Sequence, residues 1–162
     1  MSGDDASMRV RPMAAGDLDR VQEIAAGLAQ APQWRRSAYE AALDPTKVHR
    51  VAMVAEDAGT SRIEGFVIAR LTPPEAELES IAVAAGLQRM GVGRRLLQEL
   101  VRDAGALGMS SIALEVRASN QAARGFYEAL SFTEVGRRRS YYADPIEDAV
   151  LMERREPVAE SP

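Results

Sequence analysis

The amino-acid sequence predicts a single-domain α/β protein in which a mixed sheet of about seven strands is flanked by about four helices. Its 162 residues, 46% hydrophobic and 27% charged, have the length and balance of one soluble globular domain. Stretches of alternating apolar and polar residues interleave with stretches of helical periodicity, and neither a repeat nor a linker divides them. We expect the domain to span residues 8–154, with disordered tails at 1–7 and 155–162, because these ends are polar or contain proline.

Strand and helix signals in the first part of the chain are separated by clear breaks. Residues Met8–Met13 alternate apolar and charged side chains, which is typical of a strand. Residues Asp17–Ala31 place leucine, valine and isoleucine on one helical face, and the proline that follows ends the predicted helix. Residues Ser37–Leu43 predict a second, short helix with Ser37 as its N-cap, stopped by an Asp-Pro pair.

Three strands are expected in the middle of the chain. Residues His49–Glu56 and Glu64–Leu71 flank a polar, glycine-containing turn, which predicts an antiparallel hairpin. Two consecutive prolines then break the chain, and Ala76–Val83 alternates again as a third strand.

The second half is expected to alternate helices and strands. Residues Gly91–Ala104 and Gln121–Leu130 have apolar side chains at helical spacing. The segments around them alternate and predict the strands Ser111–Val116, Phe132–Arg139 and Ala149–Arg154. The first of these strands, with the strand and helix before it, predicts a parallel pair joined by a right-handed crossover.

Composition excludes several kinds of chemistry. The chain has no cysteine and a single histidine, His49, which excludes disulfides, thiolate nucleophiles and multi-histidine metal sites, so we expect no metal. A net charge of −4 argues against direct binding of nucleic acid. The apolar runs are far shorter than the roughly 20 residues of a membrane span, and the acidic N-terminal segment does not resemble a secretory signal. We therefore expect a cytoplasmic protein without membrane contact.

A glycine-rich turn, residues 88–94, joins a predicted strand to the helix that begins at Gly91. Its two glycines, Gly91 and Gly93, allow a ligand to approach the backbone closely. The first N–H groups of a helix lack intrahelical partners and attract anions, and three nearby arginines add positive charge. The pattern predicts a phosphate or diphosphate site, although it is neither a Walker loop nor a GxGxxG motif. The alternative is a glycine-rich helix cap with solvated arginines.

Three segments resemble a known family. The turn reads Gln-x-x-Gly-x-Gly, residues 114–128 read LEVRASNQAARGFYE, and residues 138–152 contain RRSYY followed by EDA and a methionine. Together they resemble the motifs of the Gcn5-related N-acetyltransferase (GNAT) superfamily. Within it, they are similar to the branch that acetylates the N-terminal alanine of ribosomal protein S18. The resemblance covers about residues 8–154.

The resemblance implies acetyl-CoA as the acetyl donor and a sheet that splits in a V at the acetyl-CoA site. It implies that Ile81, Ala82 and Val83 line the pantetheine arm, with a strand N–H near Val83 polarising the thioester carbonyl. The other implied donor-binding residues are Arg89, Met90, Gly91, Val92, Gly93 and Arg94 around the diphosphate, and Asn120, which would also cap a helix. Since cysteine is absent, we expect direct attack by the acceptor in a ternary complex.

Two side chains are implied to move protons. Glu115 corresponds to the general base that deprotonates the amine, and Tyr127 to the general acid that protonates the leaving thiolate. Strand alternation places Glu115 opposite the apolar residues of an internal strand, where a carboxylate is costly unless it is paired or faces a cleft. The alternatives are a salt bridge between Glu115 and Arg117, and a purely structural Tyr127.

Two other carboxylates compete for the role of base. Glu77 and Glu79 lie on the predicted strand before the glycine-rich turn, and alternation predicts that they share a face with Ile81 and Val83. Because an acid on this strand is the base in other members of the superfamily, Glu79 ranks second to Glu115.

The acceptor site is implied to lie in loops. Trp34, Tyr141 and Tyr142 are expected to wall the N-terminus of a protein acceptor, and the acidic Glu147 and Asp148 suit a cation. The implied acceptor is a ribosomal protein similar to S18. The alternatives are another amine, such as a lysine side chain or a small metabolite, and a non-catalytic sensor that binds acyl-CoA.

Three residues depart from the family pattern. Ser131 stands where a left-handed glycine is usual after a helix, at an expected cost of about 1 kcal/mol. Gly125 and Phe126 replace a small-aliphatic pair before Tyr127, and a glycine inside a helix also costs about 1 kcal/mol.

Overall fold

The computed structural model describes residues 7–156, and in that range one seven-stranded sheet carries four α-helices. The strands are β1 (Met8–Pro12), β2 (Arg50–Asp57), β3 (Ile63–Thr72), β4 (Glu75–Val83), β5 (Ser111–Arg117), β6 (Thr133–Tyr142) and β7 (Glu147–Arg155). The helices are α1 (Leu18–Ala26), α2 (Arg36–Ala42), α3 (Val92–Ala106) and α4 (Gln121–Ala129), with short 3₁₀ turns at Ala15–Asp17 and Ala85–Leu87. The predicted fold class and order of elements are confirmed.

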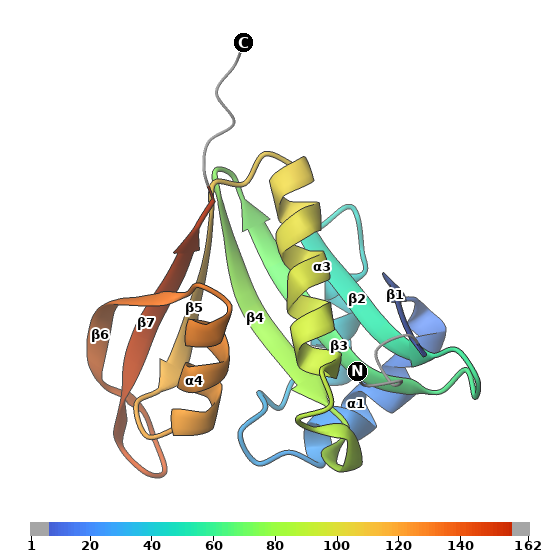
Figure 1. Ribbon diagram of the computed structural model, residues 1–162, viewed down its shortest axis with the longest axis horizontal. Coiled ribbons are helices and arrows are strands. Elements are labelled where there is room, and N and C mark those ends of the chain that lie inside the picture. Colours follow the sequence, from blue (N-terminus) through green and yellow to red (C-terminus); the bar gives the residue numbers. More distant parts are fainter. Residues whose placement is uncertain (1–6, 157–162) are drawn as a thin grey trace.

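The sheet divides into two arms between β4 and β5. Its strand order is β1-β2-β3-β4-β5-β7-β6, and the parallel β4–β5 pair joins two sets of antiparallel strands. Although β4 runs to Val83 and β5 to Arg117, the two strands pair only at residues 75–77 and 111–113. Beyond those residues they diverge, as Figure 1 shows, with α3 over one arm and α4 over the other. This divergence is the predicted V-shaped split.

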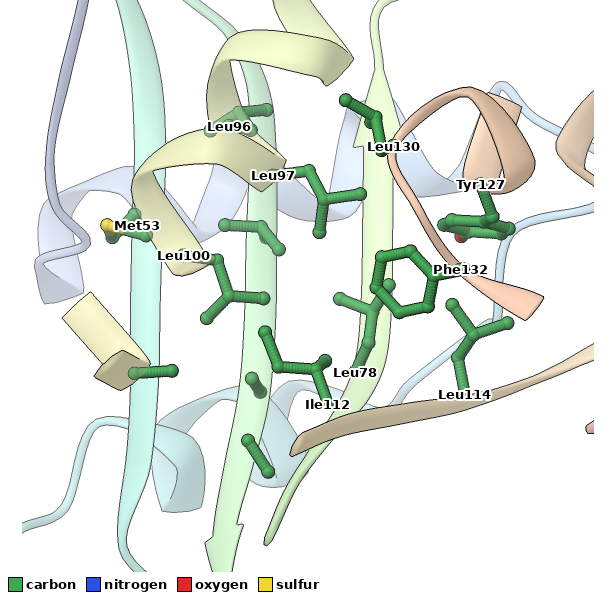
Figure 2. Packing of buried hydrophobic residues seen from close by; sticks show 14 of the residues in the cluster. Met53, Leu78, Leu96, Leu97, Leu100, Ile112, Leu114, Tyr127, Leu130 and Phe132 are labelled. Atoms are coloured by element: carbon green, nitrogen blue, oxygen red, sulfur yellow. The ribbon is translucent and has the colours of Figure 1, made fainter. Parts of the chain in front are cut away.

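Two apolar clusters hold the molecule together, one on each face of the sheet. The larger cluster lies beneath α3 and α4 and includes the fully buried Leu96, Leu97 and Leu100 (Figure 2). The smaller cluster lies beneath α1 and α2 and includes Tyr39 and Phe66. Within the described range, no residue of β5, β6 or β7 belongs to the smaller cluster. The first arm is therefore covered on both faces, and the second arm on one.

A β-bulge in β4 reverses which side chains face which cluster. The register between β3 and β4 skips Glu79, which stands as the extra residue. Before the bulge Leu78 joins the larger cluster, and after it Ala82 joins the smaller one, while Ile81 and Val83 pack against the larger. The prediction that the two glutamates of β4 share a face with Ile81 and Val83 is wrong, because an inserted residue interrupts period-two alternation.

The first two helices differ from prediction at their ends. Helix α1 stops at Ala26 instead of residue 31, with Gly27 as its C-cap, because glycine is a poor helix former. Helix α2 starts at Arg36 and its N-cap is Arg35, which makes no side-chain capping bond. Ser37 therefore lies inside the first turn and is not the predicted cap.

The last hairpin is longer and less regular than predicted. Strand β6 extends to Tyr142 and β7 begins at Glu147, so the hairpin includes residues that were expected in a loop. Between Arg138 and Tyr142 three residues of β6 oppose one residue of β7. In this bulge Ser140 has a left-handed φ of +49°, and its amide donates to the Asp148 carboxylate at 2.9 Å. The bulge takes the tyrosine pair out of regular alternation.

The described chain continues slightly beyond the predicted domain limits. Strand β7 runs to Arg155, and the Glu156 amide then donates to the Ser110 carbonyl at 2.8 Å. Ser7, the last residue of the expected N-terminal tail, is also described, and its carbonyl accepts a hydrogen bond from the Ala58 amide. The rest of the expected tails, residues 1–6 and 157–162, lies outside the described residues. In residues 7–156 we find no helix with the length and apolar character needed to span a membrane.

Candidate active site

The glycine-rich turn presents N–H groups and positive charge at the start of α3. Gly91 is the N-cap and has a φ of +86°, which glycine adopts without strain. The Arg95 amide donates to the Gly91 carbonyl at 2.9 Å, so the amides of residues 92–94 come before the first bond of the helix. Arg89 and Arg94 are exposed beside them, as is Met90, whereas the Val92 side chain is buried in the core. This arrangement suits a bound anion.

The unpaired edge of β4 faces the split. The Ala84 amide donates to the Glu64 carbonyl on β3 at 2.8 Å. Backbone groups on an antiparallel strand point alternately to its two sides, so the N–H groups of Ile81 and Val83 point away from β3, towards the split. Near this edge, a Cβ on Gly93 would lie 3.5 Å from Phe126 of α4 and 3.6 Å from Val83. The start of α3, the end of β4 and α4 therefore meet at one end of the split.

Glu115 lies on β5 with its side chain on the face opposite the larger cluster. Its two strand neighbours are buried in that cluster, whereas 24% of the Glu115 side chain is exposed. One carboxylate oxygen lies 3.2 Å from Nε of Arg138, which reaches across from β6. Tyr141 forms a side-chain hydrogen bond with Glu115, and this bond raises the pKa of the Tyr141 hydroxyl. The alternative prediction, that Glu115 forms a salt bridge, is confirmed, but its partner is Arg138 and not Arg117.

Tyr142 packs against a second arginine. The guanidinium carbon of Arg117 is 4.4 Å from the centre of the Tyr142 ring, and the rings of Tyr141 and Tyr142 pack edge to face at 5.1 Å. Burial, and after it the charge of Glu115, raises the pKa of Tyr142. Arg117 is itself anchored, because it contacts Glu147 at 3.5 Å and two loop carbonyls at 3.3 Å.

Two acidic residues organise the loops around this cluster. Glu147 accepts the Ser119 amide at 2.6 Å, which ties β7 to the turn before α4, and this hydrogen bonding lowers the pKa of Glu147. Asp148 holds Ser140 in the β6 bulge through a 2.9 Å hydrogen bond. Both carboxylates were expected to face a cationic acceptor, and in the structure both hold backbone amides.

Tyr127 extends from α4 into the larger cluster. It is 9% exposed, and its ring packs against Phe126 at 5.2 Å and Phe132 at 5.6 Å; Figure 2 shows it beside Phe132 and Leu130. Burial, with a smaller contribution from Tyr142, raises the pKa of Tyr127, so the phenol remains protonated at neutral pH. Tyr127 therefore lies on the core side of β5, whereas the Glu115 side chain lies on the opposite face, and the charge effect of Tyr142 extends to Tyr127.

The ends of α4 agree with the sequence predictions. The Asn120 side chain accepts the Ala123 amide at 3.2 Å, so it caps the helix as predicted. Ser131 has a φ of +71°, the left-handed conformation expected where the family has glycine. The helix continues through Gly125 without a break. Contact between Asn120 and a bound donor stays a prediction.

A separate pocket lies beside α2. It has a volume of about 540 Å³ and is lined by Trp34, Arg35, Ser37, Ala38, Ala41, Arg50 and Glu79. Glu79 lies 2.7 Å from Nε of Arg50, and both side chains are less than one-fifth exposed. Trp34 packs on Tyr39 with 5.3 Å between ring centres. Trp34 is therefore placed near Glu79, whereas the tyrosine pair is placed near Glu115.

Two arginines that contact the competing bases were not predicted from the sequence. Arg50 pairs with Glu79, and Arg138 pairs with Glu115. Arginine supplies almost all positive charge in this chain, so nothing in the sequence distinguished Arg50 from the others. Arg138 belongs to the RRSYY segment that resembles the family, and that segment was the available signal.

Comparison with known proteins supports one family. The sequence model of the acetyltransferase (GNAT) family matches residues 18–132. The chain is 43% identical over 93 residues to the [ribosomal protein bS18]-alanine N-acetyltransferase of Escherichia coli, covering 56% of this chain and 63% of that enzyme. This match spans less than two thirds of the relative. The N-alpha-acetyltransferase RimI of Mycobacterium tuberculosis is 35% identical over 159 residues, which covers 95% of this chain and 96% of the relative.

A solved structure shows the same fold. The crystal structure of the ribosomal-protein-S18-alanine N-acetyltransferase from Escherichia coli matches with a TM-score of 0.81 and 28% identity, covering 96% of each chain. The family match spans most of the chain and includes the glycine-rich turn, Glu115 and Tyr127. The chain therefore belongs to the GNAT acetyltransferase family.

Proposed function

We propose that this protein transfers the acetyl group of acetyl-CoA to the α-amino group of a protein N-terminus, with the N-terminal alanine of a ribosomal protein similar to bS18 as acceptor. The main support is that the elements bordering the split, β5 and α4, carry a carboxylate, Glu115, and a protonated phenol, Tyr127. The relatives described above are named for this type of reaction, and one of them matches along nearly its whole length.

The groups around the split suit acetyl-CoA. The amides at the start of α3, with Arg89 and Arg94, match the negative charge of its diphosphate. The N–H groups of Ile81 and Val83 suit the polar groups of the pantetheine arm and the thioester oxygen. Bound acetyl-CoA supplies the activated acyl group, and these residues bind and orient it.

Glu115 and Tyr127 account for the proton transfers. A free α-amino group has a pKa of ~7.7–8.0, so Glu115 first accepts a proton from the ammonium form. The nitrogen lone pair then bonds to the carbonyl carbon as the carbon–sulfur bond breaks. Tyr127 gives its proton to the leaving sulfur. The attached nitrogen then loses its second proton, which restores the Tyr127 phenol, and Glu115 releases its proton to solvent. The raised pKa of Tyr127 means that the phenol is protonated at neutral pH, which is the form that a general acid needs.

The test uses two peptides and labelled acetyl-CoA. The first peptide begins with a free alanine and contains an internal lysine, and the second is identical except that its α-amine is already acetylated. We expect label on the first peptide alone, located at the α-nitrogen by mass spectrometry. Label on lysine in both peptides would favour a broader amine acetyltransferase. Calorimetric binding of acetyl-CoA without transfer to either peptide would favour the sensor.

A further inference from the structure

The Arg138 side chain crosses strand β7 to contact Glu115. It lies on the edge strand β6 opposite Ala149 of β7, whereas Glu115 lies on β5, two strand spacings or about 10 Å away. The Ala149 side chain is a single methyl group, so the arginine side chain can pass over β7. Its Nε ends 3.2 Å from the carboxylate that we propose as the base.

The two arginines beside the tyrosine pair are held differently. Arg117 is 25% exposed, stacks on Tyr142 at 4.4 Å and contacts both Glu147 and loop carbonyls. Arg138 is 58% exposed and lies 5.6 Å from the centre of the Tyr141 ring, and the ion pair to Glu115 is its close polar contact. Exposed ion pairs of this kind are weak and are readily exchanged. Arg117 is therefore an anchored residue, and Arg138 a displaceable one.

We propose that Arg138 occupies the position on Glu115 that the acceptor's ammonium group takes, and that the arriving acceptor displaces it. This inference rests on the proposed function. A guanidinium and an ammonium carry the same charge and both donate N–H bonds to a carboxylate, so the exchange leaves the charge of the site unchanged.

The exchange has a chemical consequence. A guanidinium does not release a proton in proteins, so Glu115 does not act as a base towards Arg138. An α-ammonium can release one, so proton transfer to Glu115 begins when the acceptor replaces Arg138. Arg138 acts as an internal competitor, and an acceptor must gain contacts beyond its charge, such as those with Tyr141 and Tyr142, to displace it.

The first test is kinetic, with the free-alanine peptide as acceptor. Arg138→Ala should lower the acceptor KM about two- to fivefold, the range of an exposed ion pair, and leave kcat within about twofold. Arg138→Lys should keep the wild-type KM because it restores a competing cation. Arg137→Ala is the matched control, since it removes the same charge from the same strand but pairs with Glu134, and it should leave KM unchanged. An unchanged or higher KM in Arg138→Ala, or a kcat loss that Arg138→Lys restores, would overturn the proposal.

The second test does not need acetyl transfer. In protein labelled with ¹⁵N-arginine, the Nε–Hε signal of Arg138 is assigned by its loss in Arg138→Ala. Adding alaninamide should move this signal towards its position in Glu115→Gln, where the ion pair is absent. A signal that stays in place overturns the inference even if peptides are acetylated. A moving signal with no peptide acetylated supports the displacement and counts against the proposed function alone.

Discussion

The two arms of the split sheet are stabilised in different ways. The arm of β1 to β4 lies between α3 on one face and α1 with α2 on the other, and its side chains join both apolar clusters. The arm of β5, β7 and β6 has α4 on one face, and its other face carries Glu115, two arginines and the tyrosine pair. Strand β6 is exposed along nearly its whole length.

The number of covered faces limits which functional groups each arm can carry. An arm covered on both faces offers mainly backbone groups at its free edge, because buried charges are costly there. An arm with one bare face can carry a carboxylate and arginines in contact with water. Carboxylate-to-backbone bonds partly replace the missing layer, as Glu147 holds Ser119 and Asp148 holds Ser140.

The largest expected effect tests whether the general base lies on the arm of β5, β7 and β6, which has one bare face. Glu115→Gln should lower kcat by about 10²- to 10⁴-fold, because the amide cannot accept the proton, and should leave acetyl-CoA affinity unchanged. Glu79→Gln is the matched control in the covered arm and should keep most activity. A greater kcat loss in Glu79→Gln would move the base to β4.

The next effect concerns the phenol between the arms. Tyr127→Phe should lower kcat by about 10²-fold, the low end for an acid, because a thiolate with an ordinary pKa near 8.5 also leaves without help. Calorimetry should show acetyl-CoA affinity within about twofold of wild type. Because burial raises the pKa of Tyr127, the wild-type kcat should show no alkaline decline below about pH 10. A kcat equal to wild type in the variant would remove Tyr127 from the mechanism.

A smaller effect tests whether the backbone at the start of α3 contributes to acetyl-CoA binding. Gly91→Val forces a branched residue into a φ of +86°, at about 1–2 kcal/mol, so acetyl-CoA should bind about 5- to 30-fold more weakly in calorimetry. Gly86→Ala, at a site with no atom within 4 Å of the added methyl, is the control and should bind normally. Unchanged affinity in Gly91→Val would refute the diphosphate site.

An ion pair far from the bare face is expected to affect stability and to leave activity unchanged. Asp17 accepts two hydrogen bonds from Arg11 at 2.9 Å, so Asp17→Asn should lower the free energy of unfolding by about 1–2 kcal/mol and leave kcat unchanged. The Arg11 hydrogen bonds lower the pKa of Asp17 in the folded state.

The pH dependence of that difference follows from the lowered pKa. The stabilisation is complete above the ordinary pKa of 3.8 and is lost as the pH falls through the lower folded value. Urea unfolding should therefore show a large gap between wild type and Asp17→Asn at pH 7 and a smaller gap well below pH 4. An equal gap at both values would mean that the charge of Asp17 is not involved.

The site was predictable in part. Alternation along β5 placed Glu115 opposite the core, and the family resemblance selected the tyrosine pair near Glu115 and Tyr127 on the core side of β5. The pairing of Glu115 with Arg138 was not predictable, because it depends on a side chain crossing β7.

The fold class, the order of elements and the residues with local roles follow from the amino-acid sequence alone. Gly91 at the start of α3, Asn120 as a cap and the left-handed Ser131 all depend on neighbours a few residues away. The tertiary structure decided which face each β4 side chain takes after the bulge and which cation each carboxylate meets. Those outcomes depend on register and packing between distant segments, which local spacing does not encode.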